Sequence, residues 1–349
     1  MIMDEERSTG EFGKTILQQR ADSLLDELVS LKRRPDEKSI HDTRVQSRRL
    51  RAALEAFQDL FAPHPWQAVY SAVKEITRTL GGPRETGVII LLLRDLGGAG
   101  DMAESLCREY LMERLQEKLQ KQEKRLERTL KAIDPSRLRS RIAFLLAGME
   151  LPAESNTIVD AADWAAKRPN RRRRQQNPFQ PTLFPLHEEA LERAQRILRQ
   201  LMEPILAFRP RYDFRKATDD QIHALRIGAK KLRYAMELFD PIWRGGLKNP
   251  IAEARALQDA AGDFHDSCDL CRCLKTDIRR LNKGETVHLA FQIGRLLAFA
   301  EERRTELRKQ ILPAMKTLQS TLHQLLGETG AGKDLRPPAM AESLAKSRL

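Results

Sequence analysis

The chain has 349 residues, with 61 Lys and Arg against 49 Asp and Glu, which gives a formal net charge of +12 and a pI of about 9.7. This length favours two domains over one compact core, and the charge favours an anionic partner such as nucleic acid, another polyphosphate chain or an anionic membrane surface. The longest apolar run, residues 88–93, is far short of the ~20 residues that span a bilayer, and four cysteines are too few for a disulfide scaffold. The N-terminus has no apolar segment of a signal peptide. We therefore expect a soluble, cytoplasmic protein without membrane insertion.

Apolar residues recur at helical spacing along most of the chain, and no alternating run indicates a strand, which predicts an all-α fold. The first half, residues 1–150, is expected to contain helices at 12–33, 41–62, 66–81, 86–96, 101–131 and 136–149. The second half, residues 186–327, is expected to contain helices at 186–206, 219–239, 249–262, 266–281, 285–309 and 311–326.

Residues 151–185 separate these halves and contain five prolines and the run Arg171–Arg174, so we interpret them as a linker. The arginine run is either a solvated charge cluster or a flexible arm for a polyanion. Residues 328–349 are expected to form a disordered tail.

One basic segment occurs twice. The segment "IHDTRVQSRRLRAALEAF" at residues 40–57 is identical at eight of 18 positions to "IHALRIGAKKLRYAMELF" at 222–239. A second pair of segments follows each copy and aligns Gly81 with Gly262. A repeat this long indicates a duplicated domain, and we expect its halves to pack about a pseudo-two-fold axis.

On a helix of about 100° per residue, each copy places its cations along one stripe and its apolar residues opposite. The first stripe runs from His41 to Arg51, about 15 Å at 1.5 Å per residue, and carries no acidic residue before Glu55. Such a row repels itself, so it is expected to face an anionic partner rather than solvent. Two facing rows would line a basic groove suited to a linear, closely spaced anion. The alternative is a structural role, with cations extending from a bundle interface and histidines bonded internally.

These residues resemble the CHAD domain family, the conserved histidine α-helical domain. Its hallmark is His-x-x-Arg-Val-x-x-Arg-Arg-Leu-Arg followed by a Leu-Gly-x-x-Arg-Asp turn, present in both halves. The first copy here is His41, Arg44, Val45, Arg48, Arg49, Leu50 and Arg51, with the turn Leu80, Gly81, Arg84 and Glu85. The second copy is His223, Arg226, Ile227, Lys230, Lys231, Leu232 and Arg233, with the turn Gly262, His265 and Asp266. The resemblance covers roughly residues 10–326.

The resemblance implies two four-helix bundles related by a pseudo-two-fold axis, with inorganic polyphosphate bound in a basic channel between them. It also links the chain to polyphosphate or polyester storage granules. Because no phosphoryl-transfer motif occurs, we expect a non-catalytic protein without a cofactor. The triphosphatase (CYTH) signature Glu-x-Glu-x-Lys is absent, so the chain resembles a stand-alone member. Glu85 stands where the family has Asp, and His265 stands where the first half has Arg84. The expected polyphosphate-binding residues are His41, Arg44, Arg48, Arg49, Arg51, Lys74, Arg84, His223, Arg226, Lys230, Lys231, Arg233, Arg255 and His265.

Other chemistries have weaker signals. No Walker-type loop occurs, and the segment "GDFHDSCD" at 262–269 has residues that could bind a metal but is more simply interpreted as acidic capping at a helix start. The spacing of Cys268, Cys271 and Cys273 lacks a second ligand pair for zinc, so we expect core cysteines. Nucleic-acid binding in the same groove is the alternative function, although only 5% of residues are aromatic and no stacking platform is evident.

Overall fold

The computed structural model describes residues 9–96, 100, 102–150, 188–208, 217–243, 245–281 and 287–327. Within these ranges the regular structure is entirely helical, as predicted. The predicted linker, with Arg171–Arg174, and the predicted tail at 328–349 lie outside the described residues. The helices are α1 (Thr9–Arg33), α2 (Glu37–Ala56), α3 (Pro63–Thr79), α4 (Gly81–Asp95), α5 (Met102–Ala132), α6 (Pro135–Ala147), α8 (Glu188–Ala207), α10 (Asp219–Phe239), α11 (Lys248–Leu281) and α12 (Val287–Gly327). Short 3₁₀ turns are η1 (Gln58–Leu60), η2 (Gly148–Glu150) and η3 (Asp240–Trp243).

The two repeated segments form α2 and α10, and both helices begin with a capping box. In α2 the Asp36 carboxylate accepts a hydrogen bond from the Ser39 amide at 2.8 Å, and the Ser39 hydroxyl accepts from the Asp36 amide at 3.0 Å. In α10 the Thr218 hydroxyl accepts from the Gln221 amide at 3.2 Å, and the Gln221 side chain accepts from the Thr218 amide at 2.8 Å. Each cap lies five residues before its motif histidine, so both helices start in the same register relative to the basic stripe.

The helix breaks predicted in the second half, at residues 263–265 and at residue 310, are wrong. Residues 248–281 form the single helix α11, and residues 287–327 form α12, which continues through Pro313. The corresponding glycine of the first half does begin a new helix, because α3 ends at Thr79 and α4 starts at Gly81. In α11, Ala261 and Phe264 are buried on either side of Gly262, so core packing holds the helix through this position. The segment interpreted as a capped helix start therefore lies in mid-helix.

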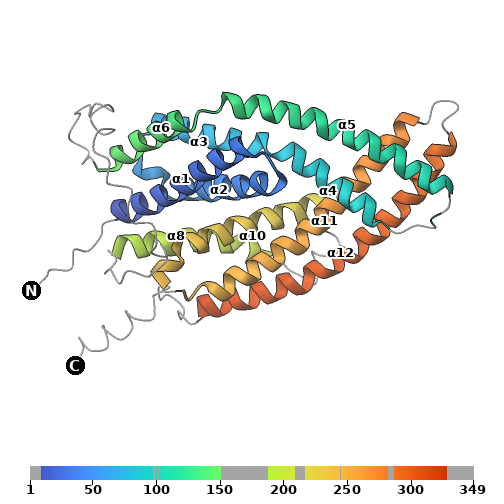
Figure 1. The fold of residues 1–349 in the computed structure, drawn as a ribbon. Helices are drawn as coiled ribbons and strands as arrows, with labels where there is room; N and C mark the ends of the chain where they lie inside the picture. Colours follow the sequence, from blue (N-terminus) through green and yellow to red (C-terminus); the bar gives the residue numbers. More distant parts are fainter. Residues whose placement is uncertain are drawn as a thin grey trace, which may run out of the picture.

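Two hydrophobic cores hold the helices together, and Figure 1 shows how these helices are arranged. The larger core joins α1, α2, α3, α6 and the C-terminal part of α5 to α8, α10 and parts of α11 and α12. The smaller core packs Leu93 of α4 and Leu111 of α5 against Leu274 of α11 and Ile293 of α12, at the end where these four helices meet. Each core takes residues from both predicted halves.

The motif helices α2 and α10 contact each other directly. Phe57 and Phe239, which occupy equivalent positions in the repeat, are fully buried, and their rings meet edge to face with centroids 6.2 Å apart. The apolar faces predicted for both helices are confirmed, since Leu50, Leu54 and Leu232 are also buried. The pseudo-two-fold axis itself stays a prediction. No described helix combines the length and apolarity needed to span a membrane.

Candidate functional site

Cations from the two motif helices converge around Lys230 of α10. The pKa of Lys230 is lowered to about 8, first by burial and then by the positive charges of Arg48, Arg226, Arg51 and Arg44. Arg44, Arg48 and Arg51 come from α2, whereas Arg226 comes from α10. Because charge interactions weaken with distance, these shifts mean that the two predicted rows lie close to each other.

Arg44 and Arg226 hold equivalent places in this cluster. Burial lowers the pKa of Arg44 to about 10, with contributions from the charges of Arg48, Arg84 and Arg226, partly offset by Glu85. The Nε atoms of Arg44 and Arg226 are both buried and lack a hydrogen-bond partner within the described part of the chain. A buried donor without a partner costs about 1–3 kcal/mol, and more when it is charged, so each guanidinium is short of an acceptor.

Small residues make room for these two arginines. A Cβ atom at Gly81 would lie 3.1 Å from Nη1 of Arg44, and one at Gly262 would lie 3.5 Å from Nε of Arg226. The aligned glycines of the two segments thus stand beside the aligned arginines. The sequence alignment paired these residues without indicating that they touch.

Histidines lie at the N-terminal end of both rows. The pKa of His41 is lowered by burial and by the charge of Arg84, so these residues from α2 and α4 lie close to each other. In the second half the rings of His223 and His265 lie 4.5 Å apart, and the pKa of His223 is lowered by burial and then by His265. The Nδ1 atom of His223 is buried and has no hydrogen-bond partner among the described residues.

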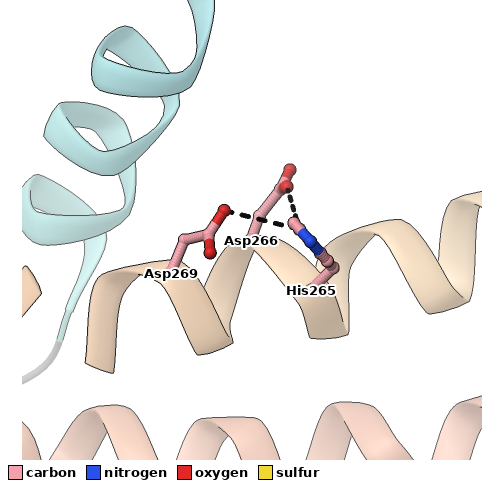
Figure 2. A group of neighbouring side chains, drawn as sticks. All are labelled: His265, Asp266 and Asp269. Carbon is pink, nitrogen blue, oxygen red and sulfur yellow. Dashed lines mark ion pairs between the residues drawn. The ribbon is translucent and has the colours of Figure 1, made fainter. Parts of the chain in front are cut away.

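His265 also belongs to a small acidic cluster on α11 (Figure 2). Its Nδ1 atom lies 3.6 Å from the Asp266 carboxylate and 3.4 Å from the Asp269 carboxylate, within ion-pair range but without hydrogen-bond geometry. One ligand atom from each of the three residues lies within 4.8 Å of the others, which is compatible with holding a cation. Asp269 is already paired with Arg272 on the next turn. Ion pairs within α11 thus account for this arrangement.

The other end of the site is organised by Glu237 of α10. Its carboxylate lies 3.2 Å from Nε of Arg49, 2.6 Å from Nη1 of Arg233 and 3.8 Å from Nη2 of Arg255. Arg233 is buried and also donates a hydrogen bond to Gln258 at 3.1 Å. Three of the cations predicted to bind an anion therefore already have an internal partner.

The first half has a looser counterpart of this arrangement. Arg51 lies 3.7 Å from Glu55 and donates to the Tyr70 hydroxyl at 3.1 Å, while Tyr70 donates to Glu55 at 2.6 Å. The remaining predicted residues, Lys74 on α3 and Lys231 on α10, are exposed.

Arg20 of α1 is a site residue that the sequence did not indicate. Its pKa is lowered by burial and then by the charge of Arg49, while Glu237 raises it, so Arg20 lies near the arginines that surround Glu237. It belongs to an ordinary amphipathic helix outside the repeated segments, and nothing in its spacing distinguishes it from other surface cations.

Comparison of the sequence with known protein families identifies a family that matches most of the chain, including both basic helices. The CHAD domain profile matches residues 15–275. The chain belongs to the CHAD domain family. Its fold also matches the crystal structure of the CHAD domain from the plant Ricinus communis, with a TM-score of 0.61, 21% identity, and coverage of 90% of this chain and 94% of that one.

A second fold match is PptA from Streptomyces chartreusis, with a TM-score of 0.60 and 16% identity over 89% of this chain and 100% of that chain. Identities this low show a shared fold alone. No curated protein matches the chain.

Proposed function

We propose that this CHAD protein binds inorganic polyphosphate between α2 and α10 and does not hydrolyse it. The proposal depends on one observation: Lys230 is half-buried among four arginines. The Nε atoms of three of them, Arg44, Arg51 and Arg226, are buried and have no acceptor within the described part of the chain. Like charges held together away from water are unfavourable unless an anion compensates them.

The arrangement of charges favours an extended anion. Glu55 and Glu237 pair with cations at the C-terminal end of the rows, whereas the stretch from His41 to Arg48 has no carboxylate on the same stripe. Arginines bind phosphate oxygens through parallel N–H groups, and Lys230 adds a point charge among these arginines. A polyphosphate chain presents such oxygens at every unit, so it can satisfy the whole row.

Nucleic acid is the alternative ligand, because its phosphodiester backbone carries the same kind of charge. Sequence-tolerant binding of single strands normally adds aromatic side chains on which bases stack. Tyr234 of α10 lies under the guanidinium of Arg233, with the Arg233 Cζ atom 4.4 Å from its ring centroid, but it is buried. Phe57 and Phe239 are fully buried and pack on each other. We therefore expect polyphosphate to displace DNA and RNA at equal phosphate concentration.

The test is a competition titration with labelled long-chain polyphosphate at ~150 mM salt, near physiological ionic strength. The variant Arg44→Glu/Arg226→Glu should bind at least 100-fold more weakly, because it replaces two cations of the site with anions. The variant Arg137→Glu/Arg141→Glu is a matched control, since both residues are exposed on α6 and the change in net charge is the same.

An equal loss of affinity in both double variants would show that binding depends on net charge and not on a specific site. Unchanged binding in Arg44→Glu/Arg226→Glu, with circular dichroism showing folded protein, would reject the site between α2 and α10. Full displacement by DNA or RNA would favour the alternative ligand.

Absence of catalysis and cellular location need separate measurements. We expect polyphosphate incubated with the protein and Mg²⁺ to keep its chain length on a gel. Cytoplasmic location is a prediction from the sequence, and association with polyphosphate or polyester granules is a prediction from the family resemblance. A fluorescent fusion would test both.

A further inference from the structure

Glu237 places a negative charge where the proposed ligand would otherwise extend. We propose that Glu237 is an internal competitor, a tethered carboxylate that occupies the end of the anion-binding row and limits how tightly polyphosphate engages the arginines there. This inference rests on the proposed function and assigns a specificity-determining residue to the same site.

The surroundings of Glu237 are those of a bound anion. Arg49 reaches it from α2, Arg233 from its own helix and Arg255 from α11, at 3.2, 2.6 and 3.8 Å. Its side chain is only 12% exposed, and Arg20 of α1 adds a fourth positive charge nearby. One carboxylate thus pairs with three guanidinium groups and has a fourth nearby, which leaves an excess of positive charge around it.

These arginines differ in how firmly they are held. Arg233 is 9% exposed and has Gln258 as a second partner, so it stays in place without Glu237. Arg49 is 27% exposed and Arg255 is 57% exposed, so an anion from solvent can reach both. A phosphate that binds Arg49 and Arg255 must compete with the Glu237 carboxylate for them and is repelled by its charge.

The equivalent residue of the first half provides an internal comparison. Glu55 is 41% exposed and accepts a 2.6 Å hydrogen bond from the neutral Tyr70 hydroxyl. Among the described residues its one arginine partner is Arg51, at 3.7 Å. The repeat therefore retains a glutamate in both copies but surrounds only the second one with arginines. We expect the competitor function to belong to Glu237 and not to Glu55.

The experiment compares wild type, Glu237→Gln and Glu55→Gln in titrations with long-chain polyphosphate over a range of salt concentrations. Both substitutions remove one negative charge and nearly preserve side-chain shape. Glu237→Gln should bind roughly three- to tenfold more tightly, with a steeper salt dependence, because Arg49 and Arg255 then pair with phosphate and release more counterions. Glu55→Gln should change affinity less than about twofold.

Thermal unfolding provides a second readout. Without its carboxylate the arginine cluster repels itself, so Glu237→Gln should melt lower than wild type without ligand and gain more stability from saturating polyphosphate. If Glu237→Gln does not fold, Glu237→Asp takes its place, because the shorter carboxylate moves away from Arg49 and Arg255 and should also tighten binding.

The outcomes separate the two proposals. Wild-type protein that fails to bind polyphosphate would reject the proposed function together with this inference. If wild type binds polyphosphate but the Glu237 variants bind it with the same or lower affinity, only the competitor function is rejected. An equal gain in affinity in Glu55→Gln would also reject only that function.

Discussion

Lys230 shows how a single side chain links the fold to ligand binding and pH. Its pKa is lowered to about 8 by burial and by four arginines, so part of the population is neutral slightly above physiological pH. A bound polyanion favours the protonated amine and raises this pKa, so binding takes up a proton. Affinity should then fall as pH rises from 7 to 9.5, by roughly three- to tenfold.

Polyphosphate titrations at constant ionic strength across this pH range would measure the effect. Lys230→Arg is the control, because a guanidinium keeps its charge and should make the profile flatter. A wild-type profile that is flat from pH 7 to 9.5 would show that Lys230 does not contact the ligand.

The same residue should lower the stability of the ligand-free protein. The unfolded chain holds the proton with the ordinary lysine pKa of about 10.5, so it binds more protons than the folded chain between pH 8 and 10.5. This unfavourable contribution is fully present below pH 8 and is relieved as pH rises toward 10.5. Lys230→Met should therefore stabilise the ligand-free protein at pH 7 by about 1–2 kcal/mol, a value reduced for the remaining solvent contact.

Urea unfolding of Lys230→Met at pH 7 and at pH 10 would test this sign. The advantage over wild type should shrink at the higher pH, and the variant should bind polyphosphate more weakly at pH 7. A variant less stable than wild type at pH 7 would show that the lysine stem packs more favourably than its charge repels.

At the scale of the element, the capping boxes fix where each motif helix starts. Thr218 satisfies the Gln221 amide at the start of α10, and this turn leads directly to His223. Thr218→Ala should lower the free energy of unfolding by about 1 kcal/mol, whereas Thr218→Ser, which keeps the hydroxyl, should stay near wild type. Chemical denaturation would measure both, and equal values for the two variants would mean that this cap does not stabilise α10.

The helices α11 and α12 show why local signals misplaced two breaks. Glycine and proline are common at helix ends, and Gly262 lies at the first predicted break while Pro313 lies close to the second, at residue 310. The first half does interrupt its chain between α3 and α4 at the aligned glycine. Buried residues on both sides, such as Ile311 and Met315 around Pro313, keep the second-half helices continuous. Tertiary packing outweighed a local preference of roughly 1–3 kcal/mol.

For the whole molecule, the two cores predict cooperative unfolding. Both α11 and α12 contribute to each core, so loss of one core removes support from the other. Leu274 is 1% exposed in the smaller core, and Leu274→Ala should destabilise the protein by about 2–5 kcal/mol. Trp66 and Trp243 are buried in the larger core and report on it by fluorescence.

Unfolding curves from tryptophan fluorescence and from far-ultraviolet circular dichroism should coincide in wild type and shift together in Leu274→Ala. A variant in which fluorescence keeps its midpoint while helicity is lost earlier would show that the cores unfold separately.

The helical fold, the family, the duplicated motif and the cations that meet around Lys230 could be predicted from the sequence alone. These follow from local periodicity and from a repeat that brings Arg44 and Arg226 to equivalent positions, and such patterns are visible without any contact between helices. Which cations have internal partners became clear from the fold, not from the sequence pattern. Arg233 lies on the predicted stripe, yet it is buried against Glu237 and Gln258, and Arg20 joins the site from a helix outside the repeat. Sequence spacing cannot show these partners, because the free energy of a charge depends on its burial and on neighbours that the fold brings from distant parts of the chain.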